Sequence, residues 1–316
     1  MIASFTQFML FIQLISIAML TIWIMALGWC EQTLLAILIS AVLTSVPRTY
    51  IIINNFFTAC VFDARRTDGK KYHRWQLLLL MLQEFFWSSV CWYWTFPFAS
   101  LALRIDSQHQ GLPVLLIHGY GCNSGYWSKL SRLLQKQNIT HSAINCEPVL
   151  AGIDDYAVLI ENAITTLCQH TGQSQVIILG HSMGGLSARA YMRRYGEEKI
   201  ARVITLGTPH HGSKLASAAW GLNAQQMRWT EHEQASNWLK TLSAAESPST
   251  RARIVSIYSR HDNIVFPQQS SHLPHARNIE IELVGHVALA FAKQSVRIVM
   301  QEITAARENK LISETR

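Results

Sequence analysis

The sequence predicts an α/β fold, with a mainly parallel sheet flanked by helices, behind an N-terminal membrane-helix region. From residue 111 onward, short apolar runs rich in β-branched residues alternate with stretches of helical length. Such alternation requires crossover connections, and these build a parallel sheet. One of the apolar runs leads directly into a G-x-S-x-G turn. The first thirty residues carry no charge and are long enough to span a bilayer.

Composition divides the 316 residues near position 104. Charged residues make up 15% of the chain, against about a quarter in a typical globular protein, and only ten of them lie in residues 1–103. We therefore expect residues 1–103 to form a membrane-anchoring region of two to three helices, and residues 104–316 to form a globular domain. The net charge of +7 is not gathered in basic blocks interleaved with aromatic side chains, which argues against a nucleic-acid partner.

Two apolar blocks open the chain. Met1–Cys30 lacks the basic start, short apolar core and small-residue cleavage site of a signal peptide, so we expect a retained membrane helix. Thr33–Val46 is interrupted by Pro47 and the apolar pattern resumes as far as Ile53. This second block is either a span kinked at the proline or a helix that lies on the membrane surface or against the first span.

A basic segment, residues 63–74, separates these blocks from a third one, Trp75–Leu103, which is rich in Trp and Tyr and contains one acid, Glu84. Such aromatic residues collect at membrane interfaces, so the third block is either a span or a half-sunk helix. The positive-inside rule keeps the basic segment in the cytoplasm. If all three blocks span the membrane, which is the arrangement we favour, the globular domain lies in the periplasm beside a bacterial inner membrane. If only the first two blocks span it, the globular domain lies in the cytoplasm. A channel or transporter is disfavoured because intramembrane charge is nearly absent.

Each element expected after residue 111 has a local signal. Its strands are short apolar runs, typical of a sheet that is buried on both faces. The expected strands are Pro113–Ile117, His141–Cys146, Val176–Leu179, Arg202–Leu206, Arg253–Tyr258 and Asn278–Val284. Its helices carry start and stop signals, such as acids in a first turn or Gly196 after a last one, and the tail after Ala306 is expected to fray. The expected helices are Gly125–Gln137, Ile153–His170, Leu186–Tyr195 and Val287–Ile303.

The G-x-S-x-G turn predicts a nucleophile at Ser182. Gly180 and Gly184 allow a buried strand to turn sharply into a helix, which leaves the serine hydroxyl at the apex. A developing oxyanion would then lie at a helix N-terminus, where free N–H groups favour negative charge. The alternative is a chance glycine-rich turn, but a strand before it and a helix after it favour the nucleophile.

A serine nucleophile needs an imidazole base and an acid that orients the base. In open α/β sheets these groups follow the carboxyl ends of strands. Asp262 follows one predicted strand after a short loop, and His286 follows the next after one glycine. Taken singly, Asp262 could be a turn-former and His286 a surface histidine. The order Ser182, Asp262, His286 instead predicts a catalytic triad.

Five segments carry a resemblance to a known family. They are VLLIHGYG at 114–121, LGHSMGG at 179–185, LGTPHHGS at 206–213, HDNIVFP at 261–267 and VGH at 284–286. With these motifs, residues 111–305 resemble an α/β-hydrolase of the bacterial lipase and esterase type. The N-terminal third is not covered by the resemblance, although some lipases and phospholipases of this type are membrane-anchored.

The resemblance implies an oxyanion hole made by the backbone N–H groups of Tyr120 and Met183. It also implies supporting roles for the residues of the loop before and around Tyr120, which are His118, Gly119 and Gly121. Two such donors contribute several kcal/mol of transition-state stabilisation.

Other histidines and the segment 212–250 are expected to support or shape the site rather than to act chemically. His210 and His211 lie in a segment that the family comparison makes a structural loop beneath the site, and no carboxylate or Cys lies at ligand spacing, so we expect no metal. His181, next to the nucleophile, is expected to shape the pocket. Residues 212–250 occupy the place of a cap, and their scattered Trp, Leu and Met side chains either line an acyl-chain pocket or pack the cap on the core.

Together these observations predict a membrane-anchored serine ester hydrolase, lipase or phospholipase A-like, that acts on lipid acyl esters through an acyl-enzyme. Its partners are the bilayer and an acyl-ester substrate, and nothing in the sequence calls for a cofactor or specifies an oligomeric state. An acyltransferase, or a short-chain esterase or thioesterase, would use the same triad. A membrane scaffold without activity would have no use for the complete triad.

Overall fold

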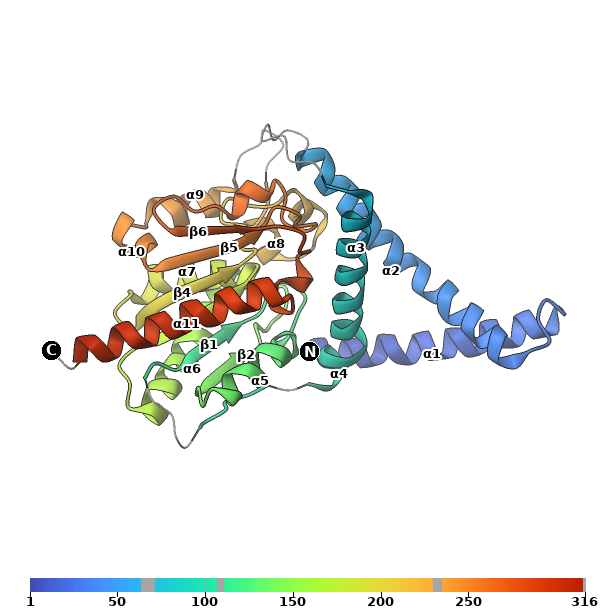
Figure 1. The fold of residues 1–316 in the computed structure, drawn as a ribbon, viewed down its shortest axis with the longest axis horizontal. Helices are drawn as coiled ribbons and strands as arrows, with labels where there is room; N and C mark the ends of the chain where they lie inside the picture. Colours follow the sequence, from blue (N-terminus) through green and yellow to red (C-terminus); the bar gives the residue numbers. More distant parts are fainter. Residues whose placement is uncertain (64–71, 100, 107–110, 230–234, 315–316) are drawn as a thin grey trace.

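A six-stranded parallel sheet forms the centre of the computed structural model, which describes residues 1–63, 72–99, 101–106, 111–229 and 235–314 (Figure 1). The strand order is β2-β1-β3-β4-β5-β6, and all five neighbouring pairs run parallel. The strands are β1 Val114–Ile117, β2 His141–Ile144, β3 Val176–His181, β4 Ile200–Leu206, β5 Ile254–Ser259 and β6 Arg277–Ile281. The predicted α/β fold and all six predicted strands are confirmed, although β2 and β6 end earlier than the sequence suggested.

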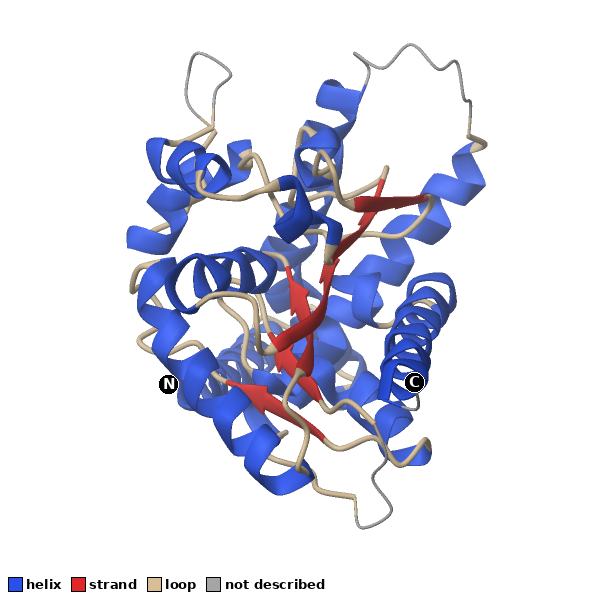
Figure 2. Cartoon of the chain, turned by 90° about the vertical axis from the view of Figure 1, so that its left-hand side faces the viewer, coloured by secondary structure: helices blue, strands red, loops and turns tan. Residues whose placement is uncertain are grey.

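Helices cover both faces of this sheet (Figure 2). One face packs against α5 (Ser128–Lys136) and α11 (Lys293–Glu314), and the other packs against α6 (Tyr156–Thr171) and α7 (Met183–Tyr195). Alternate side chains of each central strand enter the two cores, which is why those strands read as continuous apolar runs. Short helical turns complete the domain: η2 Ser124–Trp127, η3 Ile153–Asp155, η5 Gln268–Ser271 and η6 Val287–Ala290.

Two helix predictions were wrong in their bounds. The helix after the nucleophile begins at Met183, three residues earlier than expected, so no loop separates it from Ser182. The last helix is broken: η6 ends at Ala290, and α11 then begins at Lys293 and continues to Glu314. The segment after Ala306 is therefore helical rather than frayed, because Arg307 Nη1 donates a hydrogen bond to the Leu112 carbonyl (2.6 Å) and holds the helix to the domain.

The cap predicted over residues 212–250 is a set of short helices, with residues 230–234 outside the described part of the chain. They are η4 Lys214–Ala218, α8 Leu222–Gln226, α9 Asn237–Ala244 and α10 Pro248–Ala252. A buried ion pair joins the cap to α7: Arg189 donates through Nε (2.6 Å) and Nη2 (2.8 Å) to the Glu246 carboxylate. Arg251 Nε also donates to this carboxylate (3.0 Å), so the cap is fixed at its C-terminal end.

The N-terminal third is mainly helical in its described residues. Helices α1 (Ile2–Ala26) and α2 (Thr33–Asp63) pack side by side, with a hydrogen bond from Thr21 Oγ1 to Ser40 Oγ (3.1 Å). Both expose many large apolar side chains, and by length and composition the segments Ile2–Ala26 and Thr33–Cys60 could cross a membrane. Helix α2 continues through the predicted break at Pro47 and past the predicted end at Ile53.

The third apolar block lies against the globular domain. It forms α3 (Arg74–Val90), a π-helical turn η1 (Cys91–Thr95) and α4 (Phe96–Phe98), and α3 stands between α2 and the sheet (Figure 1). Among the described helices it is not one of those long and apolar enough to cross a membrane. Arg65, Arg66, Lys70 and Lys71, on which the predicted orientation depends, lie outside the described residues.

Candidate active site

Ser182 occupies a sharp turn between β3, which ends at His181, and α7, which begins at Met183. Its backbone has φ 53° and ψ −122°, a region that a residue with a side chain rarely adopts. The flanking glycines are required by close contact: a Cβ on Gly184 would lie 2.2 Å from the Ile117 carbonyl oxygen, and one on Gly180 would lie 2.6 Å from the Gly185 nitrogen. The packing therefore holds the strained serine at the apex, as the motif predicts.

The loop after β1 approaches this serine closely. A Cβ on Gly119 would lie 2.9 Å from Ser182 Cβ, and Gly121 turns the chain away with φ 65°. His118 holds the loop in place, since its Nδ1–H donates to the Gly119 carbonyl (2.8 Å) and its Nε2 accepts from the Cys146 N–H (3.0 Å). Burial lowers the pKa of His118 to about 4, so the ring is neutral and acts as a structural bridge.

Tyr120 and Met183, the predicted oxyanion-hole donors, lie beside Ser182. Tyr120 follows Gly119 in the same loop and lines the cavity beside Ser182, while Met183 is the first residue of α7. In the described part of the chain, no hydrogen bond engages the backbone N–H of either residue. Both amides therefore remain free to donate to a ligand.

Asp262 and His286 lie after β5 and β6 and form a buried pair. The Nδ1–H of His286 donates to Asp262 Oδ2 (2.7 Å), and Asp262 Oδ1 accepts from the N–H groups of Ile264 (2.9 Å) and Val265 (2.7 Å). Burial alone would lower the pKa of His286, but the Asp262 carboxylate and its hydrogen bond raise it above the usual value. The pair leaves His286 Nε2 to act as a base.

Ser182 and His286 line the same cavity, of about 270 Å³. Its walls are mostly aliphatic and come from the cap and from the loops that bear Asp262 and His286. The aliphatic lining residues are Leu215, Ala216, Ala219, Met227, Val265 and Val287. Of the cap side chains singled out from the sequence, Met227 lines this cavity. Trp238 instead donates from Nε1 to Asp154 Oδ2 (2.7 Å), and Trp220 is 81% exposed. The sequence could not separate these three roles because all are apolar or aromatic.

An aromatic column runs from α3 to His286. The ring of Trp87 stacks on Phe291 (4.5 Å between centroids), Phe291 meets Tyr126 (5.5 Å), and Tyr126 stacks on His181 (4.3 Å). The His181 ring lies 4.5 Å from that of His286, and its Nε2–H donates to the His286 carbonyl (3.2 Å). Burial lowers the pKa of His181 far below its usual value, so this ring is neutral and shapes the cavity, as expected.

The histidine pair in the TPHHGS segment is occupied by protein contacts. His210 Nδ1 accepts from Arg189 Nη1 (3.3 Å), and its Nε2 lies 3.3 Å from Thr205 Oγ1. Among the described residues, no group of three His, Cys, Asp or Glu side chains is placed to hold a metal ion. His210 thus ties the loop to α7, a structural role.

Sequence reasoning assigned no role to three residues beside the triad. Asn263 Oδ1 accepts from the His286 N–H (3.0 Å), and Gln268 Nε2 donates to the Asp262 carbonyl (3.2 Å). Glu84 accepts from the two N–H groups that follow His286. The one available signal was compositional: Glu84 is the single acid of a long apolar block.

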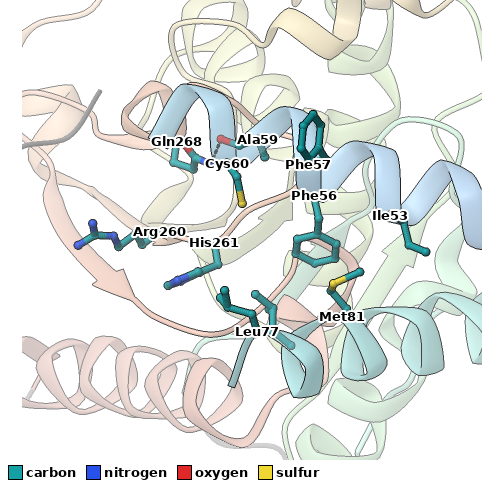
Figure 3. A pocket seen from close by; sticks show the side chains of 11 residues that line it. Ile53, Phe56, Phe57, Ala59, Cys60, Leu77, Met81, Arg260, His261 and Gln268 are labelled. Carbon is teal, nitrogen blue, oxygen red and sulfur yellow. Dashed lines mark hydrogen bonds between the residues drawn. The ribbon is translucent and has the colours of Figure 1, made fainter. Parts of the chain in front are cut away.

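A second cavity, of about 230 Å³, lies between α2, α3 and the loop after β5 (Figure 3). Phe56, Leu77 and Met81 give it apolar walls, and His261 and Gln268 close one side. Neither the nucleophile nor the acid–base pair lines it, so the first cavity is the candidate active site.

Comparisons with known proteins agree with this geometry. A family model described as "alpha/beta hydrolase fold" matches residues 113–230. The mature lipase of Bacillus licheniformis is 17% identical and superimposes with a TM-score of 0.52 over 64% of this chain and 95% of that one. The chain has the α/β-hydrolase fold. The family match includes Ser182 and the oxyanion loop, whereas Asp262 and His286 lie C-terminal to it.

Relatives in sequence match about a third of this chain. A triacylglycerol lipase of Pseudomonas fragi is 31% identical over 115 residues, which are 35% of this chain and 39% of that protein. One from Pseudarthrobacter phenanthrenivorans is 29% identical over 112 residues, 33% of this chain and 35% of that protein. The chain thus spans less than two-fifths of the length of these relatives.

Proposed function

We propose that this α/β-hydrolase is a membrane-anchored serine ester hydrolase that cleaves lipid acyl esters. One observation carries the proposal: Ser182 and His286 line one apolar cavity, and His286 is hydrogen-bonded to the buried Asp262. An apolar wall beside a nucleophile suits an acyl chain. The sequence similarity to triacylglycerol lipases supports an acyl ester as the substrate class.

In the proposed mechanism, Ser182 Oγ attacks the ester carbonyl carbon while His286 Nε2 takes the hydroxyl proton. Asp262 fixes the imidazole tautomer and stabilises the imidazolium. The N–H groups of Tyr120 and Met183 donate to the oxyanion. Collapse of the tetrahedral intermediate breaks the ester C–O bond, and His286 protonates the leaving alcohol. Water, deprotonated by His286, then hydrolyses the acyl-enzyme and releases the acid and the free serine.

We infer that α1 and α2 anchor the enzyme in a bilayer. Their large exposed apolar side chains, such as Met19 and Ile22, are more favourably placed in lipid than in water. An anchored enzyme meets lipids at a high effective concentration, because encounter becomes intramolecular. Phospholipids, lysolipids and glycerides are therefore the first substrates to test.

The contacts of the anchor support a catalytic domain on the cytoplasmic side of a bacterial inner membrane. Ile2 packs against the core of the domain, and the Ala59 carbonyl accepts from Gln268 (3.5 Å), whereas the turn between α1 and α2 lies at the far end (Figure 1). If the helical hairpin enters and leaves the bilayer beside the domain, the domain lies on the same side of the membrane as the basic residues 63–74, which the positive-inside rule places in the cytoplasm. Periplasmic placement, favoured from sequence, requires α3 to cross. A C-terminal alkaline phosphatase fusion, active only in the periplasm, separates the two arrangements.

The test is hydrolysis of p-nitrophenyl esters of increasing acyl length by the full chain in detergent, with Ser182→Ala as the control. We expect activity on long chains that disappears in the variant, and labelling of Ser182 by a fluorophosphonate. Activity restricted to short chains would indicate an esterase or thioesterase, and acyl transfer to an added alcohol in place of hydrolysis would indicate an acyltransferase. Equal activity of both forms would refute the mechanism, and a failure to label would support a scaffold.

A further inference from the structure

The N-terminal helices contact both loops that carry the acid–base pair. On α3, Glu84 accepts hydrogen bonds from the N–H groups of Val287 (Oε1, 2.9 Å) and Ala288 (Oε2, 2.9 Å), the two residues after His286. On α2, the carbonyl of Ala59 accepts from Gln268 Nε2 (Figure 3). The same amide group donates to the Asp262 carbonyl. The helical third is thus in contact with the catalytic machinery.

Glu84 is the closest of these links to the reacting groups. Its side chain is buried, with 1% of its surface exposed, and each carboxylate oxygen accepts one backbone N–H. The fit to the loop is tight, since a Cβ on Gly285 would lie 2.5 Å from Glu84 Oε2 and 3.0 Å from Glu84 Cβ. The loop that bears His286 is therefore clamped from one side by Glu84.

A buried carboxylate in this place is costly, which suggests a use for its charge. Burial raises the pKa of Glu84 to about 6, while the two backbone hydrogen bonds and the neighbouring His286 oppose that rise. The titratable groups that face it are Asp262 and His286 from the catalytic loops, Tyr126 from η2 and Cys91 from η1. An uncharged side chain could cap the same two N–H groups, but only a carboxylate adds negative charge beside the imidazole.

We propose that Glu84 is a positioning residue for the catalytic histidine. It fixes the loop of residues 285–288, and with it the imidazole of His286, relative to Ser182, and its charge stabilises the imidazolium that forms when the serine loses its proton. The membrane-facing third of the chain then supplies a functional group of the site rather than a tether alone. This inference rests on the hydrolase function proposed above.

The test is Glu84→Gln in the full chain, with Glu31→Gln as the matched control. Gln has nearly the same shape and can accept one of the two hydrogen bonds, so we expect it to fold. Glu31 is an exposed acid between α1 and α2, away from the site. We expect kcat to fall roughly 10- to 100-fold in Glu84→Gln, as for a small displacement of a catalytic group, with KM within about twofold because Glu84 does not line the active-site cavity.

A second readout separates positioning from packing. Loss of the charge lowers the pKa of His286, so the acid limb of the kcat/KM profile moves to lower pH in Glu84→Gln and not in Glu31→Gln. NMR titration of isotope-labelled histidine, with Ser182→Ala as background, measures the same shift without any activity. An unchanged His286 titration overturns the inference, even if kcat falls. A wild-type chain without esterase activity would refute the proposed function, and the NMR titration would still decide the role of Glu84.

Discussion

Replacing Asp262 by Asn tests the role of the acid with little change in shape. Asp262 Oδ1 accepts from Ile264 and Val265, and Asn can keep both hydrogen bonds through its own oxygen. The Asn amide then faces the Nδ1–H of His286, where Asp262 Oδ2 accepts at 2.7 Å in the native protein. Two donors cannot pair, so the imidazole moves its proton to Nε2, and the nitrogen that faces the serine can no longer accept a proton.

We expect kcat of Asp262→Asn to fall about 10⁴-fold, which corresponds to about 5 kcal/mol of lost transition-state stabilisation. The melting temperature should change little, because all three hydrogen bonds re-form with the other tautomer. The assay is p-nitrophenyl ester hydrolysis, with Ser182→Ala as the floor and Asp154→Asn, the same chemical change outside the triad, as the control. A loss smaller than about tenfold would show that Asp262 does not set the tautomer of His286.

Two further predictions concern stability and pH. Glu246→Gln leaves the buried Arg189 guanidinium uncompensated, at a cost of about 3–5 kcal/mol, so differential scanning fluorimetry should give a melting temperature about 6–20 °C lower. As the control, Glu197→Gln removes the partner of a partly exposed ion pair and should cost under about 1 kcal/mol. Equal shifts in melting temperature for the two variants would contradict this prediction. Because the pKa of His286 is raised and the base must be neutral, kcat/KM should fall with decreasing pH through a midpoint above about 6.5. The same pairing contributes stability at low pH that is lost as pH rises through the folded-state pKa; a kinetic midpoint below about 6 would refute this assignment.

The sheet and the nucleophile turn were predictable because backbone geometry demanded particular residues. A strand buried on both faces needs an apolar run, and the turn at Ser182 leaves no room for a Cβ at Gly180 or Gly184. Asp262 and His286 were predicted as a pair from their places after two strands, since the carboxyl ends of parallel strands share one edge of a sheet, and the two side chains are hydrogen-bonded. These residues could be predicted because local rules and chain order determine them.

Long-range contacts explain what the sequence did not reveal. Glu84 and Val287 are 203 positions apart in the chain, and no sequence periodicity links the two. Whether α3 packs on the domain or crosses the membrane could not be predicted either, because an apolar helix has the same composition in both places. Arg307 on the last helix donates to the backbone carbonyl of Leu112, 195 positions away in the chain. Each outcome depends on which surface a side chain meets, and one sequence does not encode that locally.

The aromatic column bears on how this chain can be divided. Trp87 covers Phe291, and Lys129 Nζ lies 5.2 Å from the centre of the Trp87 ring. A chain cut at residue 104 would uncover the face of Phe291 on which Trp87 stacks, and it would remove the acceptor for the two amides that follow His286. The helical N-terminal third and the α/β domain are therefore not interchangeable modules. A water-soluble version needs a new hydrophobic partner for Phe291 and a new acceptor at the place of Glu84, whereas the outward faces of α1 and α2 can be redesigned freely.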